Sequence, residues 1–284
     1  MSCIKNVDNS RKILFVVNKT KSPAEAMAQK LASLAQKNGI LPQICADFPV
    51  PDSAFKGKDI CCVIGGDGTI LSCVQSLVKY SLPVFGINLG KLGFLATYTE
   101  EIDDESFLAL ANGNFHISER ALLKARYQGK NYYALNDFVF KDLRVAGNSD
   151  FQVFADSELV ADYVGDGLIF STPTGSTAYN LSAGGPLLSP KARAFVMTPI
   201  CPHTLSNRSL VFDYGAQIRI VCLGGENALI ADGREVATIK CGAKIELEMP
   251  ALVLKFARLS GDSYFRILRN KLGWAEDPRR HISQ

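Results

Sequence analysis

Histidine and tryptophan are scarce in this chain of 284 residues, which has 3 histidines and 1 tryptophan. His116, His203 and His281 stand in no recognisable pairing with a serine or cysteine, and no G-x-S-x-G elbow is present, so nucleophilic catalysis of the triad type is not indicated. No apolar run approaches the roughly 20 residues that a membrane-spanning helix needs. Residues 1–12 are polar and lack the apolar segment of a secretory signal. The sequence therefore predicts no membrane association and no export.

Clustered positive charge and paired cysteines are also missing. The formal net charge is +3, from 31 lysines and arginines against 28 aspartates and glutamates, and so small an excess predicts no nucleic-acid partner. The 8 cysteines are scattered without a C-x-x-C pair, and Cys61 and Cys62 fall in an apolar run. We therefore expect reduced, buried thiols in a cytoplasmic protein. Cys201 and His203 have no second ligand pair nearby, so no zinc site is expected.

The glycine-rich stretch at residues 61–72 is the one around which the rest of the chain is organised. An apolar run at 60–64 breaks into the sequence GGDGT, and helix-compatible residues follow from 70 to 79, which is the pattern of a strand, a loop and a helix. Glycines allow close approach of a ligand, and a helix N-terminus binds phosphate. The predicted phosphate-binding residues are Gly65, Gly66, Gly68 and Thr69.

Asp67 is the unexpected residue in this loop. A carboxylate among phosphate-binding amides repels the phosphate, so it needs another role, either as a base or as a partner of a metal ion. The residues alone do not separate these two roles. An ordinary glycine turn with a capping aspartate would also account for the loop taken by itself.

Strands and helices alternate in the N-terminal part of the chain. Strands are predicted over residues 12–18, 43–46 and 83–87, helices over 22–38 (with Ser22 as N-cap) and 103–112, a polar loop over 48–58 and a second glycine loop over 88–94. This alternation is typical of a doubly wound α/β domain with a parallel sheet, which binds ligands at the carboxyl ends of its strands. Both glycine loops fall at such ends.

A second, β-rich region follows from residue 116. Its predicted strands include residues 132–140, 151–155, 217–222, 244–249 and 251–258, and residues 263–272 have the spacing of a helix that could dock on either domain. The predicted organisation is an α/β domain at 1–115, a β-rich, sandwich-like domain at 116–261 and a C-terminal segment at 262–284. With 47% hydrophobic and 21% charged residues, the chain has the composition of a globular protein of two domains.

Residues 166–186 form a third conspicuous stretch, in which an apolar strand gives way to hydroxyl side chains, glycines and one tyrosine. Such a segment is poor core material, and its small side chains and many donors suit the face of a polar, planar ligand. Ser176 or Thr177 could cap a helix. A surface loop rich in serine and threonine is the alternative.

Taken together, these stretches resemble the bacterial NAD kinases, the ATP-dependent enzymes that make NADP from NAD. The matching residues are the GGDGT box at 65–69, residues 86–88 with 92–95, the pair Asn136-Asp137, residues 166–186, and Asp232-Gly233. Lipid kinases and phosphofructokinases share loops like the GGDGT box, whereas the run at 166–186 is much more specific. The resemblance implies an NAD kinase-like fold, NAD bound between the two domains, a C-terminal segment that returns to the first domain, and pairing into homo-dimers or tetramers.

The resemblance also implies roles for individual residues. Asp67 would be the catalytic acid–base residue and would contact NAD, with Gly68 against NAD and Phe94 beside its adenosine part. The residues implied to hold the rest of NAD are Asn136, Asp137, Asp166, Thr177, Ala178, Tyr179, Asn180, Leu181 and Ser182. Asp137 stands where the family has a glutamate, which shortens its reach, and Arg234 receives no role.

The implied reactants are NAD and ATP, with Mg²⁺ or another divalent metal accompanying ATP, no metal ligand assigned to the protein, and polyphosphate as a possible second donor. Two alternatives stay open: a lipid or diacylglycerol-type kinase that shares the GGDGT loop, and a non-catalytic sensor that binds NAD or NADP. The glycine loop lacks the third glycine of G-x-G-x-x-G and the lysine of a Walker loop, which argues against a dehydrogenase and against ordinary P-loop chemistry.

Overall fold

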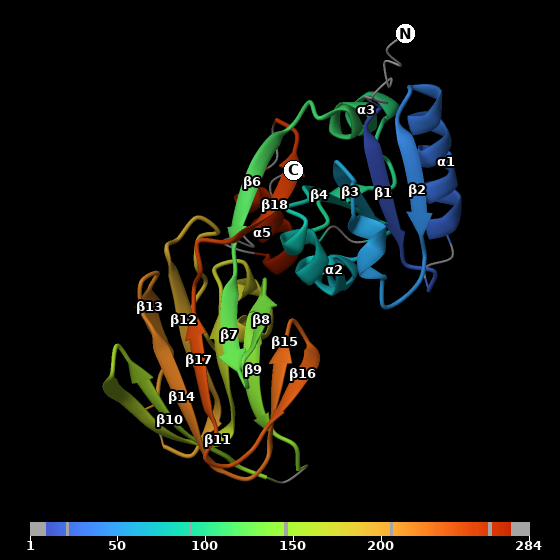
Figure 1. Ribbon diagram of the computed structural model, residues 1–284. Coiled ribbons are helices and arrows are strands. Elements are labelled where there is room, and N and C mark those ends of the chain that lie inside the picture. The colour runs from blue at the N-terminus through green and yellow to red at the C-terminus, as the bar shows by residue number, and fades with distance from the viewer. Residues whose placement is uncertain are drawn as a thin grey trace, which may run out of the picture. The chain divides into compact units, whose positions relative to one another are not determined.

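The computed structural model describes residues 10–20, 23–90, 93–144, 147–204, 207–260 and 263–273 (Figure 1). The chain divides into two compact units. The described residues up to Ser118, together with those from Lys255 onward, form the first unit, and Glu119–Leu254 form the second. Among the described residues, no helix has both the length and the apolar character needed to cross a membrane.

The first unit is built on a sheet with the strand order β2-β1-β3-β4-β18-β6, and β5 pairs beside β4. The pairs that join β1 to β2 and β3, and β4 to β3, β5 and β18, are all parallel. The strands are β1 (Lys12–Val17), β2 (Leu41–Cys45), β3 (Ile60–Ile64), β4 (Val84–Asn88), β5 (Tyr98–Thr99), β6 (His116–Ala121) and β18 (Val253–Arg258). Every residue of β3 and β4 is buried, as expected for strands covered on both faces.

Helices cover both faces of this sheet. The helices are α1 (Ala24–Lys37), α2 (Asp67–Lys79), α3 (Asp104–Asn112), α5 (Tyr264–Leu272) and the short 3-10 helix η1 (Asp52–Phe55). Helices α1 and α3 share one core with alternate residues of β1, where Phe15 stacks on Phe107 at 6.2 Å between ring centroids. The intervening β1 residues, such as Leu14, are also fully buried. This arrangement confirms the predicted α/β class.

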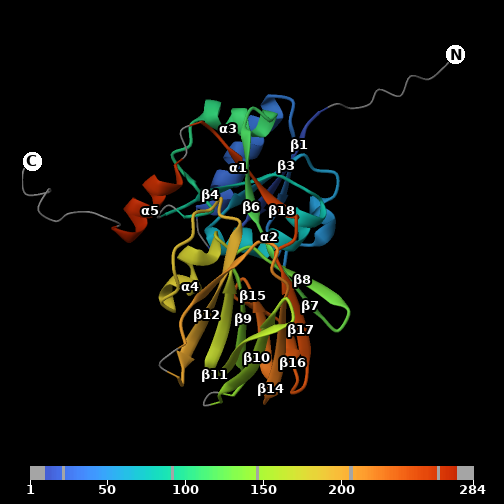
Figure 2. The same ribbon diagram turned by 90° about the vertical axis from the view of Figure 1, so that its left-hand side faces the viewer.

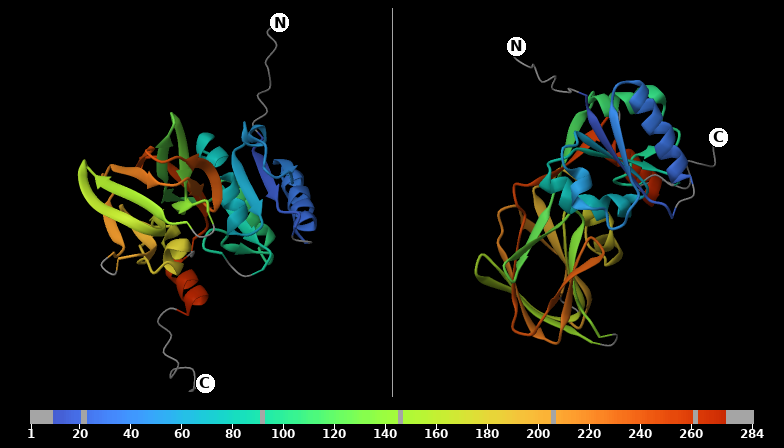
Figure 3. Two further views of the ribbon diagram at one scale, coloured as in Figure 1. Left: turned by 90° about the horizontal axis from the view of Figure 1, so that it is seen from below. Right: turned by 45° about the vertical axis from the view of Figure 1, so that its right-hand side comes forward.

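The second unit is an antiparallel sheet with the strand order β16-β15-β9-β11-β10-β14-β17-β7-β8, with β12 beside β11 and β13 beside β12. Its elements are β7 (Leu123–Tyr127), β8 (Lys130–Ala134), β9 (Asp137–Asp142), β10 (Ser149–Ala155), β11 (Glu158–Ser171), η2 (Gly175–Thr177), α4 (Tyr179–Ser182), β12 (Ala194–Pro202), β13 (Leu210–Asp213), β14 (Ile218–Gly224), β15 (Asn227–Ala231), β16 (Arg234–Ile239) and β17 (Lys244–Glu248). The sheet curls so that its strands lie in two facing layers (Figure 3). Phe140 packs edge-on against Phe151 and Phe170 in the core, with both pairs of ring centroids 5.8 Å apart. The β-rich class is therefore confirmed.

Several element boundaries differ from those predicted. The strand expected at 132–140 is two strands, β8 and β9, because the chain breaks its ladder at Leu135 and Asn136. The strand expected at 251–258 forms, but β18 joins the first sheet through a parallel pairing of Phe256 with Val84. The polar loop expected at 48–58 contains η1, whose Phe55 is buried.

The helix boundaries follow local signals where these are present. Helix α2 begins at Asp67, three residues earlier than expected, because Gly66 is extended and acts as its N-cap. The side chain of Asp103 caps α3 by accepting a hydrogen bond from the Ser106 amide at 2.7 Å. The predicted cap of α1, Ser22, lies outside the described residues, and Pro23 occupies the N-cap position.

All cysteines that the structure describes are free thiols. Cys45, Cys61, Cys62, Cys73 and Cys222 are buried, and burial raises the pKa of the Cys61 and Cys62 thiols well above the ordinary value. Cys201 and Cys241 are exposed, contrary to the expectation of core thiols throughout.

Candidate functional site

The Asp67 carboxylate links the two glycine loops of the first unit. Its Oδ2 accepts a hydrogen bond from the Phe94 amide at 2.9 Å, and its Oδ1 accepts from the amides of Leu95 at 3.2 Å and Ala96 at 2.9 Å. Gly93 lies so close to this carboxylate that a Cβ there would overlap Oδ1. The loop after β4 therefore fixes the orientation of Asp67, and the two motifs found separately in the sequence form one structure.

The four residues predicted to bind phosphate divide into two pairs. The Gly65 amide donates to the Ile87 carbonyl at 2.9 Å, and the Thr69 amide donates to the Gly66 carbonyl at 3.0 Å, so Gly65 and Thr69 shape the loop. Gly66 and Gly68 lie where the first turn of α2 leaves amides without intrahelical acceptors. Gly68 is exposed, and a Cβ there would meet no atom within 4 Å. Of the four, Gly66 and Gly68 thus stay the predicted binding positions for an anion.

Phe94, which was expected beside adenosine, is half-buried against the C-terminal helix of the same unit. Its ring lies 6.3 Å from the ring of Tyr264, and the Lys271 ammonium lies 5.0 Å from its centroid. Ser263 caps this helix, α5, by accepting a hydrogen bond from the Arg266 amide at 3.4 Å. Phe94 therefore has apolar and cationic neighbours of its own within the first unit.

In the second unit, the tight turn between β15 and β16 holds the segment 135–137. Asp232 and Gly233 form a two-residue hairpin turn with φ values of 49° and 78°, a conformation that Asp-Gly favours. The Asp232 carboxylate accepts hydrogen bonds from the amides of Leu135 at 2.9 Å, Asn136 at 2.7 Å and Asp137 at 3.3 Å. The Asp232 amide in turn donates to the Asp137 carbonyl at 3.0 Å.

The opposite side of the same segment is held by Thr172. Its hydroxyl donates to the Leu135 carbonyl at 2.5 Å, and its amide donates to the Asn136 carbonyl at 2.9 Å. Gly175 packs directly on the Asn136 backbone, where a Cβ would overlap the carbonyl. Amides and carbonyls of residues 135–137 are thus bound from two sides, and Asn136 and Asp137 lie on a rigid support.

Much of the hydroxyl-rich segment is a polar core, so the expectation that it is poor core material was wrong for this part. Ser171, Thr172, Ser176 and Asn180 are fully buried. The Asn180 side chain donates to the carbonyls of Ser176 at 3.2 Å and Pro186 at 3.0 Å, and it accepts from the Thr198 hydroxyl at 2.7 Å. Asn180, which was expected to contact NAD, therefore has the geometry of a residue that shapes the segment.

Helix capping in this segment also differs from the prediction. Neither Ser176 nor Thr177 caps a helix; the N-cap of α4 is Ala178, which has no side-chain cap. The Ser176 hydroxyl instead donates to the Pro173 carbonyl at 2.7 Å and accepts from the Leu188 amide at 3.0 Å. Thr177, Ala178 and Leu181 are half-buried, and Ser182 is exposed, so these four, together with the exposed Tyr179, contribute accessible surface to the segment.

Tyr179 marks the exposed face of α4, which lies at the end of β11 and β12 (Figure 2). Its side chain is 41% exposed, and partial burial together with the charges of Cys201, Asp137 and Asp166 raises the pKa of Tyr179. A hydrogen bond with the Asp166 carboxylate raises the pKa of the Cys201 thiol. The carboxyl groups of Asp137 and Asp166 are therefore both close enough to Tyr179 to affect its pKa.

Sequence reasoning gave no site role to two residues found here, Asp232 and Cys201. Asp232 carried a signal, the Asp-Gly pair of a hairpin turn, but the three amides that it binds are 95 to 97 residues away in the chain. Cys201 adopts a left-handed φ of 46°, which the residues around it do not predict. Among the described residues, no group of three or more His, Cys, Asp or Glu side chains could hold a metal ion.

Burial changes the acidity of the two carboxyl groups at residues 137 and 232. Desolvation, followed by the charge of Asp232, raises the pKa of Asp137 to about 7. Desolvation also raises the pKa of Asp232, to about 6. The three amide hydrogen bonds and the charge of Arg234 lower this pKa and so partly offset the effect of desolvation. Asp232 therefore ionises first as the pH rises, and the charge at Asp137 changes near neutral pH.

The Tm of the Asp137→Asn variant is expected to increase relative to the Tm of wild type as the pH rises from about 5 to about 8. The pKa values of Asp137 and Asp232 both lie above the ordinary 3.8. At pH values between 3.8 and these raised pKa values, the folded chain therefore binds more protons than the unfolded chain. The stability linked to the two groups is therefore present at low pH and is lost as the pH rises toward 7. Calorimetric Tm values for both proteins across this pH range measure the effect. A Tm difference that stays constant with pH contradicts it.

Family models match both parts of the chain. The ATP-NAD kinase N-terminal domain matches residues 50–115, and the ATP-NAD kinase C-terminal domain matches residues 135–259. The first match contains the Asp67 loop and the second contains the Asp232 turn. With the fold, these matches place the chain in the class of two-domain kinases that use nucleotides.

Relatives and solved structures agree. The chain is 39% identical to an NAD kinase of Carboxydothermus hydrogenoformans, over 78% of this chain and 81% of that protein. It is 32% identical to an NAD kinase of Lachnoclostridium phytofermentans, over 93% and 99% of the two chains. The structure of yeast NADH kinase complexed with NADH has the same fold, with a TM-score of 0.83 at 24% identity over 95% of this chain and 89% of that one. The chain belongs to the NAD kinase family, and the resemblance seen in the sequence is confirmed.

Proposed function

We propose that this chain transfers the γ-phosphoryl group of ATP to the 2′-hydroxyl of the adenosine ribose of NAD, giving NADP and ADP, with Asp67 as general base. The observation that carries the assignment to Asp67 is its carboxylate geometry. Within the part of the chain that the structure describes, three amides occupy three of the roughly four acceptor positions of this carboxylate, which leaves one at Oδ2. A fixed carboxylate with one free position suits the transfer of one proton better than the ligation of a metal ion.

The chemistry requires such a base. A ribose hydroxyl is a weak nucleophile at neutral pH, and a carboxylate that accepts its proton as the new P–O bond forms contributes about 10²–10⁴ in rate. The amides at Gly66 and Gly68, at the positive end of α2, support the charged phosphate oxygens of the donor. Phosphoryl transfer depends mainly on such positioning and electrostatic stabilisation.

The second unit supplies the residues that bind NAD. Asn136, Asp137, Asp166 and Tyr179 provide donors, acceptors and an aromatic face, and the accessible residues of 177–182 surround them. Asn180 supports this surface from beneath. The side chain of Asp137 is shorter than the family's glutamate by one methylene. Asp137 is buried and its amide donates to Asp232, so its backbone position limits how far its carboxylate extends.

A divalent metal, Mg²⁺ by preference, enters with ATP as part of the donor substrate and neutralises charge on its phosphates. The described residues offer no side-chain cluster that would hold it independently. We further propose a cytoplasmic protein that assembles as a homo-dimer or tetramer.

The test is a reaction of the purified chain with NAD and MgATP, read by an NADP-specific dehydrogenase. Formation of NADP in proportion to enzyme is expected, and no product with any of several divalent metals would end the proposal. Diacylglycerol in mixed micelles replaces NAD in a parallel reaction, so that phosphorylation of the lipid alone would favour the lipid kinase. Stoichiometric binding of NAD without turnover would favour a sensor. Polyphosphate in place of ATP defines the range of donors.

A further inference from the structure

We infer that Asp232 is a positioning residue for NAD: its carboxylate sets the segment 135–137 in the conformation from which Asn136 and Asp137 bind the dinucleotide. This inference rests on the proposed function, and it assigns a role to a residue that does not itself need to touch NAD. Three consecutive amides converge on one carboxylate, at 2.9, 2.7 and 3.3 Å. Three donors on one acceptor group fix the backbone of the segment far more tightly than one hydrogen bond would.

The geometry of the turn makes Asp232 suited to this task. Asp232 has a left-handed φ of 49°, which aspartate tolerates better than most residues, and it is followed by Gly233 at 78°. The Asp232 amide also donates to the Asp137 carbonyl, so the turn and the segment exchange hydrogen bonds in both directions. A shift of this turn would therefore move the Asp137 backbone with it.

The same carboxylate acts on Asp137 electrostatically. Its charge is one of the two causes that raise the pKa of the buried Asp137 carboxyl group. Two further groups interact electrostatically with the pair. Arg234 lowers the pKa of Asp232, and Asp137, together with Cys201 and Asp166, raises the pKa of Tyr179. Asp232 therefore controls both the position of Asp137 and the pH at which it becomes a carboxylate.

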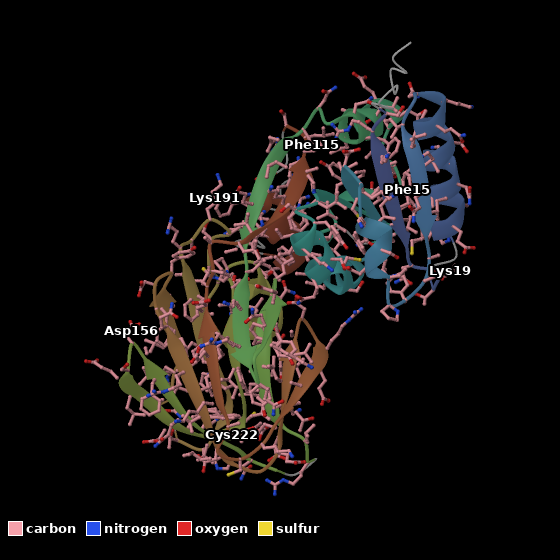
Figure 4. The ribbon with its side chains drawn as sticks, in the orientation of Figure 1. Phe15, Lys19, Phe115, Asp156, Lys191 and Cys222 are labelled. Atoms are coloured by element: carbon pink, nitrogen blue, oxygen red, sulfur yellow. The ribbon has the colours of Figure 1, made fainter. Side chains whose placement is uncertain are left out.

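A matched control exists in the same unit. Asp156 also has φ 49° in a two-residue turn, between Ala155 and Glu158, and lies at the tip of the hairpin of β10 and β11 (Figure 4). Its carboxylate accepts one hydrogen bond, from the Gln217 amide at 3.0 Å, and its amide donates to the Gln217 carbonyl at 3.0 Å. Asp156→Asn thus alters a turn aspartate without touching residues 135–137.

The experiment compares Asp232→Asn, Asp232→Glu and Asp156→Asn with wild type. In Asp232→Asn, KM for NAD is expected to rise about tenfold, as for the loss of a charge-assisted hydrogen bond, while kcat and KM for ATP change by no more than about twofold. Asp232→Glu keeps the charge but shifts its reach, so it should raise KM for NAD without moving the pH profile. Asp156→Asn should leave all of these constants unchanged.

The pH profile separates positioning from a purely structural role. In wild type, KM for NAD should fall as the pH rises through about 7, where Asp137 ionises. In Asp232→Asn, the midpoint should move to lower pH because the neighbouring charge is gone. An unchanged KM and midpoint in a folded Asp232→Asn protein would overturn the inference. So would failure of both Asp232 variants to fold while Asp156→Asn folds, because Asp232 would then be architectural.

The inference and the proposed function can fail separately. If wild type forms no NADP, the proposed function is wrong, whatever Asp232 does. Calorimetric titration of each variant with NAD then still tests positioning, since weaker binding by Asp232→Asn than by Asp156→Asn does not depend on turnover. Equal binding by the two variants would overturn the inference even in an active enzyme.

Discussion

Asp67→Asn is expected to lower kcat by about 10²–10⁴, the contribution of a general base, while NAD still binds. Asparagine has nearly the same shape and keeps an oxygen for the Leu95 and Ala96 amides, and it loses the acceptor of the Phe94 amide alone, so most of the contacts that hold the loop after β4 should remain. What it cannot do is accept the proton of the ribose hydroxyl. Steady-state kinetics give kcat, and calorimetric titration gives the affinity for NAD.

Asp103→Asn is the control for this prediction. Asp103 also stands at the start of a helix in the first unit, and it too accepts a backbone hydrogen bond, from Ser106. Its replacement should change stability little, because asparagine caps a helix about as well as aspartate, and it should leave kcat unchanged. Near-normal turnover in Asp67→Asn would show that Asp67 is not the base, and lost NAD binding would show that its role lies in the binding of substrate.

Gly93→Ala is expected to lower kcat by about 10²-fold, the effect of a displacement of a catalytic group by about 1 Å. The new Cβ would overlap Oδ1 of Asp67, so the carboxylate must leave the amides of Leu95 and Ala96. Because a side chain rather than backbone gives way, the loss of stability should stay within about 1–3 kcal/mol. Kinetics and thermal unfolding measure the two effects.

Gly90→Ala in the same loop is the matched control, since a Cβ at Gly90 would meet no atom within 4 Å. It should leave kcat close to that of wild type. The double variant with Asp67→Asn adds a sharper test: if Gly93→Ala acts through Asp67, adding it to Asp67→Asn should cause little further loss. Fully additive losses would show that Gly93 acts elsewhere.

The sequence was most informative where short-range signals decide the structure. Apolar runs that end in glycine located β3 and β4, and their parallel pairing brought both glycine loops to one edge of the sheet. The GGDGT box covers the short loop after β3 and the first residues of α2, so the strand and the helix that it joins are enough to place it in the fold. The family and its activity followed from such motifs.

Hydrogen bonds between segments that are far apart in the chain could not be predicted from the sequence. The amides that hold Asp67 lie 27 to 29 residues away, and those of residues 135–137 are held by a turn almost 100 residues later. The hydroxyls of Thr172 and Ser176 were predicted to face a ligand, but they donate to backbone carbonyls. Every residue has a backbone carbonyl, so the sequence does not show which one a hydroxyl will bind. Burial of such groups becomes evident only when the chain is folded.

The place of β18 has a consequence for the order in which the protein is synthesised and folds. This strand lies between β4 and β6, yet it is made only after the whole second unit. Its Arg258 is buried, donates to the Leu95 carbonyl at 3.1 Å and bonds the Thr97 hydroxyl, so it supports the loop that orients Asp67. A nascent chain on the ribosome therefore lacks the Arg258 contacts of the loop that holds Asp67 until residue 258 has emerged.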